Sequence, residues 1–186
     1  EKERKTVVEI WEFDARKPGK GVATPGVKRP DPTPDEEQEL ATEEASKYRS
    51  AVGSLIYAAG IRTEMLYAVK ELARGMSKPR KIDWMDLTRL GKYLLGTQDM
   101  VAQKAVPKAT KIVDKVSDIK SAYDGDWNVE VYSDADWACA RADYRSTSGL
   151  VIKWCGCLVF AASNTQPGLP ALSSGESELR GLKRGG

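Results

Sequence analysis

Three acidic residues in the C-terminal third of the chain have the types and spacing that could bind a divalent metal ion. Asp134 and Asp136 lie within Tyr-Ser-Asp-Ala-Asp-Trp-Ala, and Glu178 lies within Ser-Gly-Glu-Ser-Glu-Leu. Two-metal phosphoryl chemistry needs several carboxylates around Mg²⁺ ions held roughly 3.5–4 Å apart. Asp134 and Asp136 would share one face of a strand that stays extended through both. Aspartates of this kind are also common as polar residues at strand ends and turns, so that alternative stays open.

The two glutamates near the end of the chain have different expected roles. Ser173 and Glu176 form a capping-box pattern, in which Ser173 is the N-cap of a helix and Glu176 is its third residue. We expect the Glu176 carboxylate to accept a hydrogen bond from the Ser173 backbone N–H. Glu178 is therefore the better metal-ligand candidate, with an ordinary surface glutamate as the alternative.

Strands must position these carboxylates, and residue patterns of period two predict three of them. They cover residues 129–132, 150–154 and 158–162, and Gly156 marks a hairpin turn between the second and the third. A helix after Leu172 completes the unit. The expected structure is a β-meander packed on a short helix.

The middle of the chain has apolar residues at helical spacing instead. Ser77-Lys78-Pro79 separates the second helix from the third, and Asp83 is the expected N-cap of the third. Three amphipathic helices joined by short loops predict a small three-helix bundle, so the expected fold class is α+β. The three apolar stripes are Val52, Leu55, Ile56 and Ala59; Leu66, Val69, Leu72, Ala73 and Met76; and Trp84, Leu87, Leu90, Gly91 and Leu94.

Basic residues gather on these predicted helices. Between Lys47 and Lys92 there are ten basic residues and only four acidic ones, although the whole chain is nearly balanced at 29 against 27. Such a surplus could form a phosphate-facing surface, and solvated helix faces with ordinary lysines are the alternative. The candidate nucleic-acid contacts are Arg74, Lys78, Arg80, Lys81, Arg89 and Lys92, together with Arg145 near the carboxylates.

Composition excludes several classes of site. The chain has no histidine, which rules out His-based triads and His-ligated metals, and its three cysteines form no CxxC pair. No apolar run approaches the ~20 residues that span a bilayer, and no signal peptide is visible. We expect reduced thiols, an intracellular protein of the cytoplasm or nucleus that is not secreted, no membrane partner, and chain ends that are fragment boundaries.

The expected organisation has four parts. Residues 1–34 form a short strand, around residues 7–11, and a Pro/Gly-rich loop. Residues 35–100 form the helical region, 101–127 a variable linker, and 128–186 the strand-rich region.

Several segments, in this order, resemble copia-type LTR retrotransposon Pol polyproteins. The first four resemble the helical, thumb-like region that follows the palm of the reverse transcriptase, and the last resembles the start of a ribonuclease H domain. The resemblance covers some 140 of the 186 residues. The matching segments are 48–57, 67–74, 76–79, 87–97 and 131–182.

The resemblance implies that Asp134 opens the ribonuclease H site and that Glu178 supplies its second ligand for Mg²⁺ or Mn²⁺. The family's later carboxylates and the polymerase's own YxDD-type aspartates have no counterpart here. The implied function is that of a Pol fragment that binds an RNA–DNA hybrid, with the rest of the polyprotein as a partner, whose complete parent hydrolyses the RNA strand. The alternatives are a decayed or domesticated nucleic-acid-binding or interaction module, and a small helical protein with no nucleic-acid role.

Overall fold

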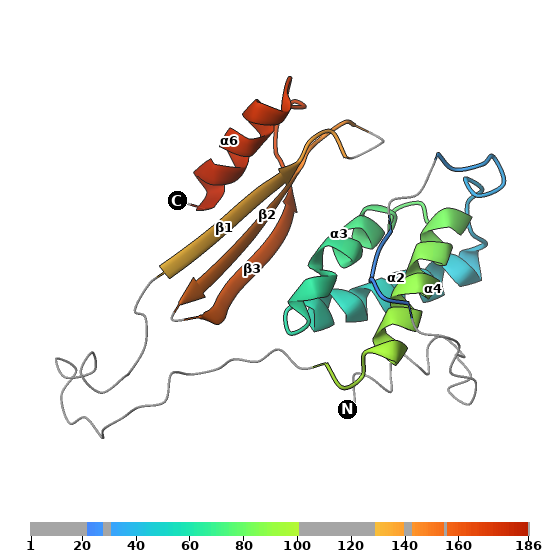
Figure 1. Ribbon diagram of the computed structural model, residues 1–186. Coiled ribbons are helices and arrows are strands. Elements are labelled where there is room, and N and C mark those ends of the chain that lie inside the picture. The colour runs from blue at the N-terminus through green and yellow to red at the C-terminus, as the bar shows by residue number, and fades with distance from the viewer. Residues whose placement is uncertain (1–21, 28–30, 101–128, 140–142, 155, 186) are drawn as a thin grey trace. The chain divides into compact units, whose positions relative to one another are not determined.

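The computed structural model describes residues 22–27, 31–100, 129–139, 143–154 and 156–185. The chain divides into two compact units, Glu1–Ala102 and Gln103–Gly186. The first unit is helical and the second contains the sheet (Figure 1). The predicted α+β class is confirmed by this mixture of helices and antiparallel strands. The strand predicted at residues 7–11 and the linker at 101–127 lie outside the described residues.

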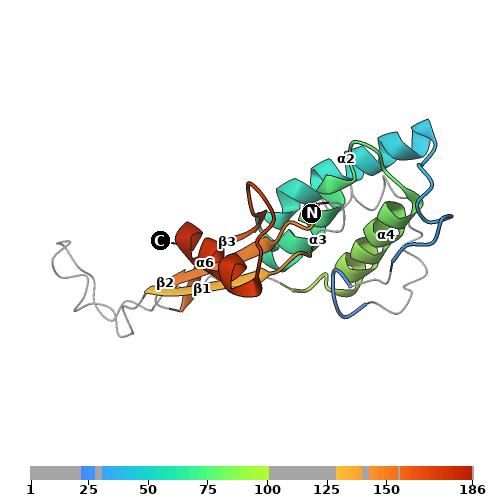
Figure 2. The same ribbon diagram turned by 90° about the horizontal axis from the view of Figure 1, so that it is seen from above.

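The described residues of the first unit form three α-helices and a short 3₁₀ helix (Figures 1 and 2). They are α2 (Thr42–Ala59), η1 (Thr63–Met65), α3 (Leu66–Arg74) and α4 (Lys81–Gly96). Their buried side chains form one hydrophobic cluster, whose members with 1% exposure or less are Tyr48, Ala51, Val52, Leu55, Met65, Leu87 and Leu90. The predicted apolar stripes therefore identify the core, with one exception. Ile56 is 50% exposed, because it lies about 100° around α2 from the buried Leu55.

The start of α4 differs from the prediction. Arg80 and not Asp83 is the N-cap, and Asp83 is the third helical residue, whose Oδ2 accepts a hydrogen bond of 2.8 Å from the Arg80 backbone N–H. The Asp83 carboxylate also lies against Gly75, where an added Cβ would come within 2.9 Å of the Asp83 Cγ. The capping carboxylate of Asp83 therefore occupies the space that a side chain at Gly75, at the end of α3, would need.

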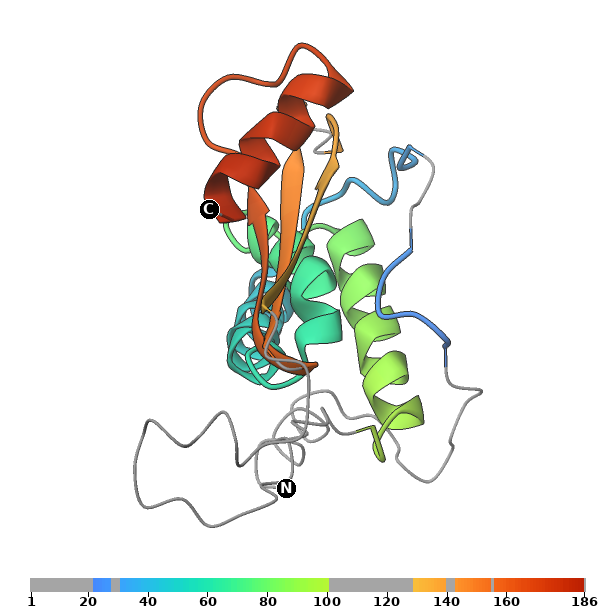
Figure 3. The same cartoon turned by 60° about the vertical axis from the view of Figure 1, so that its left-hand side comes forward.

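In the second unit, the described residues form a three-stranded antiparallel sheet and one helix. Its elements are β1 (Val129–Asp136), β2 (Thr147–Trp154), β3 (Cys157–Thr165) and α6 (Ser174–Gly185), and the strand order is β1-β2-β3. This is the predicted meander. Gly156 has a φ of +75°, the left-handed conformation that favours glycine, in the turn that joins β2 to β3. Helix α6 lies along one face of the sheet (Figure 3).

Candidate functional site

Strand β1 carries both candidate aspartates. It remains extended through Asp136, so Asp134 and Asp136 lie on one face, as predicted, and both are exposed. In the register with β2, Asp134 is opposite Gly149 and Asp136 is opposite Thr147. The alternation of side chains puts the intervening residue on the other face of the sheet.

Helix α6 packs on that other face through a close backbone approach. A Cβ added at Gly181 would lie 3.3 Å from Ser133 Oγ and 3.7 Å from Ala135 Cβ. Glu178 is half-buried and lies one helical turn before Gly181, on the same side of α6. Among the described residues there is no group of three or more His, Cys, Asp or Glu side chains that could hold a metal ion. The structure therefore does not bring Asp134, Asp136 and Glu178 together as a three-carboxylate site.

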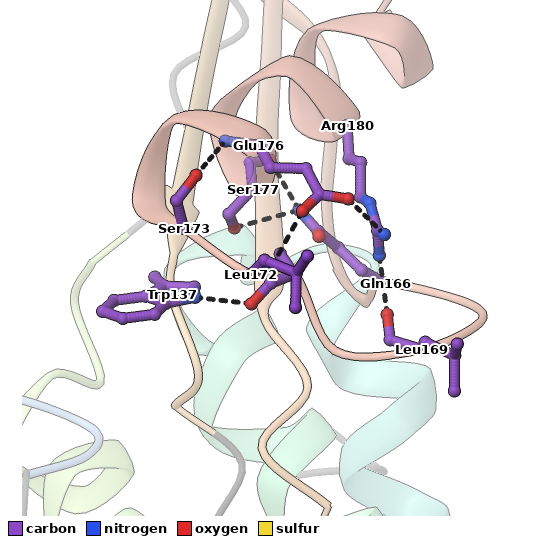
Figure 4. A network of polar contacts seen from close by, with 9 residues as sticks. Trp137, Gln166, Leu169, Leu172, Ser173, Glu176, Ser177 and Arg180 are labelled. Atoms are coloured by element: carbon purple, nitrogen blue, oxygen red, sulfur yellow. Dashed lines mark hydrogen bonds and ion pairs between the residues drawn. The ribbon is translucent and has the colours of Figure 1, made fainter.

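The N-terminus of α6 has the predicted cap with one changed partner. Ser173 Oγ accepts a 3.2 Å hydrogen bond from the Glu176 backbone N–H, but Glu176 Oε2 accepts from Leu172 N at 2.8 Å and not from Ser173 (Figure 4). Arg180 also donates to Glu176 Oε1 at 2.6 Å. The hydrogen bond from Leu172 and then the one from Arg180 lower the pKa of Glu176. Glu176 is thus occupied in fixing the helix start, which leaves Glu178 as the ligand candidate on α6.

A buried polar cluster connects α6 to the sheet (Figure 4). Gln166 is 3% exposed, and its Nε2 donates to Ser148 Oγ at 2.9 Å and to the Ser177 carbonyl oxygen at 2.8 Å. Nearby, Trp137 Nε1 donates to the Ala171 carbonyl oxygen at 2.9 Å. These contacts join the end of β1, the start of β2, the segment after β3 and the first turn of α6.

The predicted nucleic-acid contacts of the helical unit are mostly paired with carboxylates. The ion pairs are Arg74–Glu71 at 3.8 Å, Lys78–Glu39 at 3.6 Å, Arg80–Asp83 at 3.3 Å and Lys81–Asp35 at 2.8 Å. In the second unit, Arg145 pairs with Asp143 at 3.4 Å. The apparent surplus of basic residues is therefore largely neutralised, partly by acidic residues that precede α2.

Arg89 and Lys92 on α4 are different. Arg89 donates to Thr24 Oγ1 at 3.0 Å, Lys92 is exposed, and neither forms an ion pair with a carboxylate of the described residues. They are three residues apart in the helix and so share one side of it. Of the predicted contacts, these two side chains are the best candidates to bind a phosphate group, because no carboxylate of the described residues neutralises them.

Two features of the site were missed by reasoning from the sequence. The pairing of Lys81 with Asp35 spans 46 residues, although the acidic residues after Pro34 were a visible signal. The role of Gln166 had no signal, because a single glutamine after a predicted strand has no pattern of its own. Within the described part of the chain, no helix combines the length and the apolar composition that crossing a bilayer requires.

The sequence is similar to several curated proteins, two of which are retrovirus-related Pol polyproteins. The retrovirus-related Pol polyprotein from transposon RE2 of Arabidopsis thaliana is 32% identical over 157 residues, which are 84% of this chain and 9% of that protein. The corresponding polyprotein from transposon RE1 is 31% identical over 137 residues, which are 74% of this chain and 8% of that protein. Secreted RxLR effector protein 161 of Plasmopara viticola is 33% identical over 136 residues, which are 73% of this chain and 83% of that protein. No protein-family profile and no solved structure matches the chain.

The first alignment is longer than either compact unit, so it includes residues of both. The chain is at least 31% identical to each of these relatives over at least 73% of its own length. It is similar to a segment of a Pol polyprotein and spans less than a tenth of the length of the RE1 and RE2 proteins.

Proposed function

We propose that this chain is the part of a copia-type Pol polyprotein that contains the thumb-like helices of the reverse transcriptase and the first part of the ribonuclease H domain. The observation that carries the proposal is the order of elements. A helical unit is followed by three antiparallel strands, with Asp134 on the first, and then by a helix with Glu178. The sequence motifs that resemble the family occur in the same order along the chain.

The proposed role of the segment is to bind an RNA–DNA hybrid. Arg89 and Lys92 would contact backbone phosphates, and the paired cations would contribute less, because each already has a carboxylate neighbour. Cationic side chains that neutralise phosphates release condensed counterions, which makes such binding dependent on salt. The remainder of the polyprotein would complete the hybrid-binding surface.

The proposed reaction of the complete parent is hydrolysis of the RNA strand with Mg²⁺ or Mn²⁺. Asp134 and Glu178, with Asp136 as a further candidate, would supply carboxylate ligands. The described residues alone do not fit a complete metal site, because they form no group of three possible ligands. Mg²⁺ dehydrates reluctantly and is usually held by protein carboxylates together with substrate phosphates. The missing ligands would therefore come from other parts of the polyprotein and from the hybrid.

The proposal is tested with the purified chain and a fluorescein-labelled RNA–DNA hybrid. We expect the fluorescence anisotropy to rise on binding, and no RNA cleavage with either metal on a denaturing gel. Asp134→Asn should leave binding unchanged, which separates folding defects from effects on chemistry. Cleavage by the wild-type chain that Asp134→Asn abolishes would show that the site is already complete, and absence of binding at low salt would contradict the hybrid-binding role.

A second candidate is a domesticated, non-catalytic interaction module. The observation that favours it is that the alignment covers 83% of the RxLR effector protein, so proteins not much longer than this segment exist. An antibody against α6 would separate the two candidates in an immunoblot of the source cells. The Pol proposal predicts a band, or a processed product, that also contains polymerase sequence, and the module predicts a band of about this chain's own size.

A further inference from the structure

The side chain of Gln166 connects two elements that carry the candidate carboxylates. Its Nε2 donates to Ser148 Oγ of β2 at 2.9 Å. The same nitrogen donates to the Ser177 carbonyl oxygen of α6 at 2.8 Å and lies 3.3 Å from Ser177 Oγ (Figure 4). Its own backbone N–H donates to the Ser146 carbonyl oxygen at 2.8 Å. One buried residue thus fixes the segment after β3 to both the central strand and the helix.

The chemistry of the amide determines which way it points. The Ser177 carbonyl oxygen can only accept, so the amide nitrogen of Gln166 must face it. The Gln166 Oε1 is buried and has no hydrogen-bond partner among the described residues. The hydrogen bonds to Ser148 and Ser177 are therefore the interactions that compensate for the burial of this polar side chain.

The described side chains of helix α6 bury little apolar surface against the sheet. Its leucines point away from the sheet, with Leu179 68% exposed and Leu182 59% exposed. The residues that face the sheet are small, namely Ser177 at 0% exposure and the buried Gly181. Small residues permit a close approach but bury little apolar area, and the hydrophobic contribution scales with that area. The hydrogen bonds from Gln166 therefore help to hold α6 in place, together with those from Trp137 to the Ala171 carbonyl oxygen and from Arg180 to the Leu169 carbonyl oxygen.

The hydrogen bonds of the Gln166 side chain lie close in sequence or in register to each candidate ligand. Ser177 directly precedes Glu178, and Ser148 is paired in register with Ala135, the residue between Asp134 and Asp136. We propose that Gln166 is a positioning residue that fixes Glu178 relative to the two aspartates of β1. This inference rests on the proposed function of those carboxylates, whereas the attachment of α6 by Gln166 can be tested without it.

The attachment is tested by hydrogen exchange on the whole chain, with Gln166→Met as the variant. Methionine has a similar length and no donor. The matched control is Asn164→Met, an exposed position of β3 two residues earlier. Loss of hydrogen bonds to buried groups should lower the protection of the α6 amides by about tenfold or more. The amides of β1 and β2 should change much less, and the control should change neither set. Unchanged α6 protection, or an equal loss throughout the sheet, would overturn the proposal.

A second variant tests the donor role through pH. Gln166→Glu keeps the shape of the side chain but places a carboxylate against the Ser177 carbonyl oxygen. Burial and this acceptor raise the pKa of the introduced carboxyl, so the docked helix favours its protonated form, which can donate again. Protection of α6 should be weak at about pH 8 and should recover as the pH falls toward about pH 5. If Gln166 only filled space, the protection of α6 would not recover at low pH. Absence of this recovery would therefore count against the proposal.

Positioning of the carboxylates is tested with Mn²⁺ in the presence of an RNA–DNA hybrid, which supplies phosphate ligands, and is observed as paramagnetic broadening of amide signals. In the wild-type chain we expect Asp134 and Glu178 to broaden together, and in Gln166→Met we expect Asp134 to broaden without Glu178. Joint broadening at the same Mn²⁺ concentration in both proteins would overturn the positioning role. Absence of broadening in the wild type would instead contradict the carboxylate assignment, and the exchange experiment would still decide whether Gln166 attaches α6.

Discussion

Raising the salt concentration should weaken hybrid binding by an amount that depends on how many cations are already paired. When a paired lysine transfers to a phosphate, the carboxylate that it leaves takes up a cation from solution. The net release of counterions is then close to zero for that residue. Of the predicted contacts, Arg89 and Lys92 form no ion pair with a carboxylate of the described residues, so these two contribute fully.

Binding through two unpaired cations and binding through all seven predicted cations differ enough in salt dependence to be separated by one salt titration. The logarithm of the binding constant falls with the logarithm of salt by about 0.9 per phosphate contacted on duplex DNA. Two contacts give a slope of about −2, so a fourfold rise in salt weakens binding roughly tenfold. If all seven predicted cations contributed, the slope would be about −6 and the same rise would weaken binding several thousandfold.

The assay is fluorescence anisotropy of a labelled RNA–DNA hybrid at a series of salt concentrations. Arg89→Gln with Lys92→Gln should remove most of the slope, while Lys47→Gln, at an exposed lysine of α2 paired with Glu43 at 3.1 Å, is the matched control. Neutralising Asp35, the partner of Lys81, should make the slope steeper by about one contact. A wild-type slope near −6 would refute the reasoning, because the ion pairs would then open without cost. A slope near zero would refute phosphate binding altogether.

Two further predictions concern stability. Gly75→Ala should destabilise the helical unit by about 1–3 kcal/mol in chemical denaturation, because the new Cβ would lie 2.9 Å from the Asp83 Cγ; Gly53→Ala, with no atom within 4 Å of the new Cβ, should instead stabilise it slightly, and equal effects would contradict this account. The pKa of Glu176 is lowered by the Leu172 N–H and by Arg180, so its contribution to stability is present above the unfolded-state pKa and is lost as the pH falls through the folded-state value. Below about pH 5 the wild type should therefore lose stability more steeply than Glu176→Gln, and parallel pH profiles would show that the carboxylate does not contribute.

Local features of the fold could be predicted from the sequence. The alternation of apolar residues identified the three strands, and Gly156 identified the turn with positive φ. The start of α6 was predicted at Ser173 because capping depends on residues close in sequence. Asp83 was placed incorrectly because an acidic residue suits both the N-cap and the third position of a helix. The predicted bundle and the ribonuclease H-like topology stay predictions.

Contacts between distant residues could not be predicted. Lys81 belongs to the basic segment between Lys47 and Lys92, but its partner Asp35 precedes that segment. The connection of Gln166 to Ser148 and Ser177 joins three segments whose proximity follows only from the register of the folded sheet. The shared face of Asp134 and Asp136 followed from strand geometry alone, but the packing of α6, which carries Glu178, on the other face of the sheet did not.

The measurement that tests the central claim most directly is an amide shift map of the chain with an RNA–DNA hybrid and Mg²⁺. The proposed function predicts that the amides around Asp134 and Glu178, together with those around Arg89 and Lys92, shift when both hybrid and metal are present. With Mg²⁺ alone, the carboxylate region should change little, since the described residues form no complete metal site. Shifts confined to other parts of the chain, or identical shifts in Asp134→Asn and wild type at the carboxylate edge, would contradict the proposal.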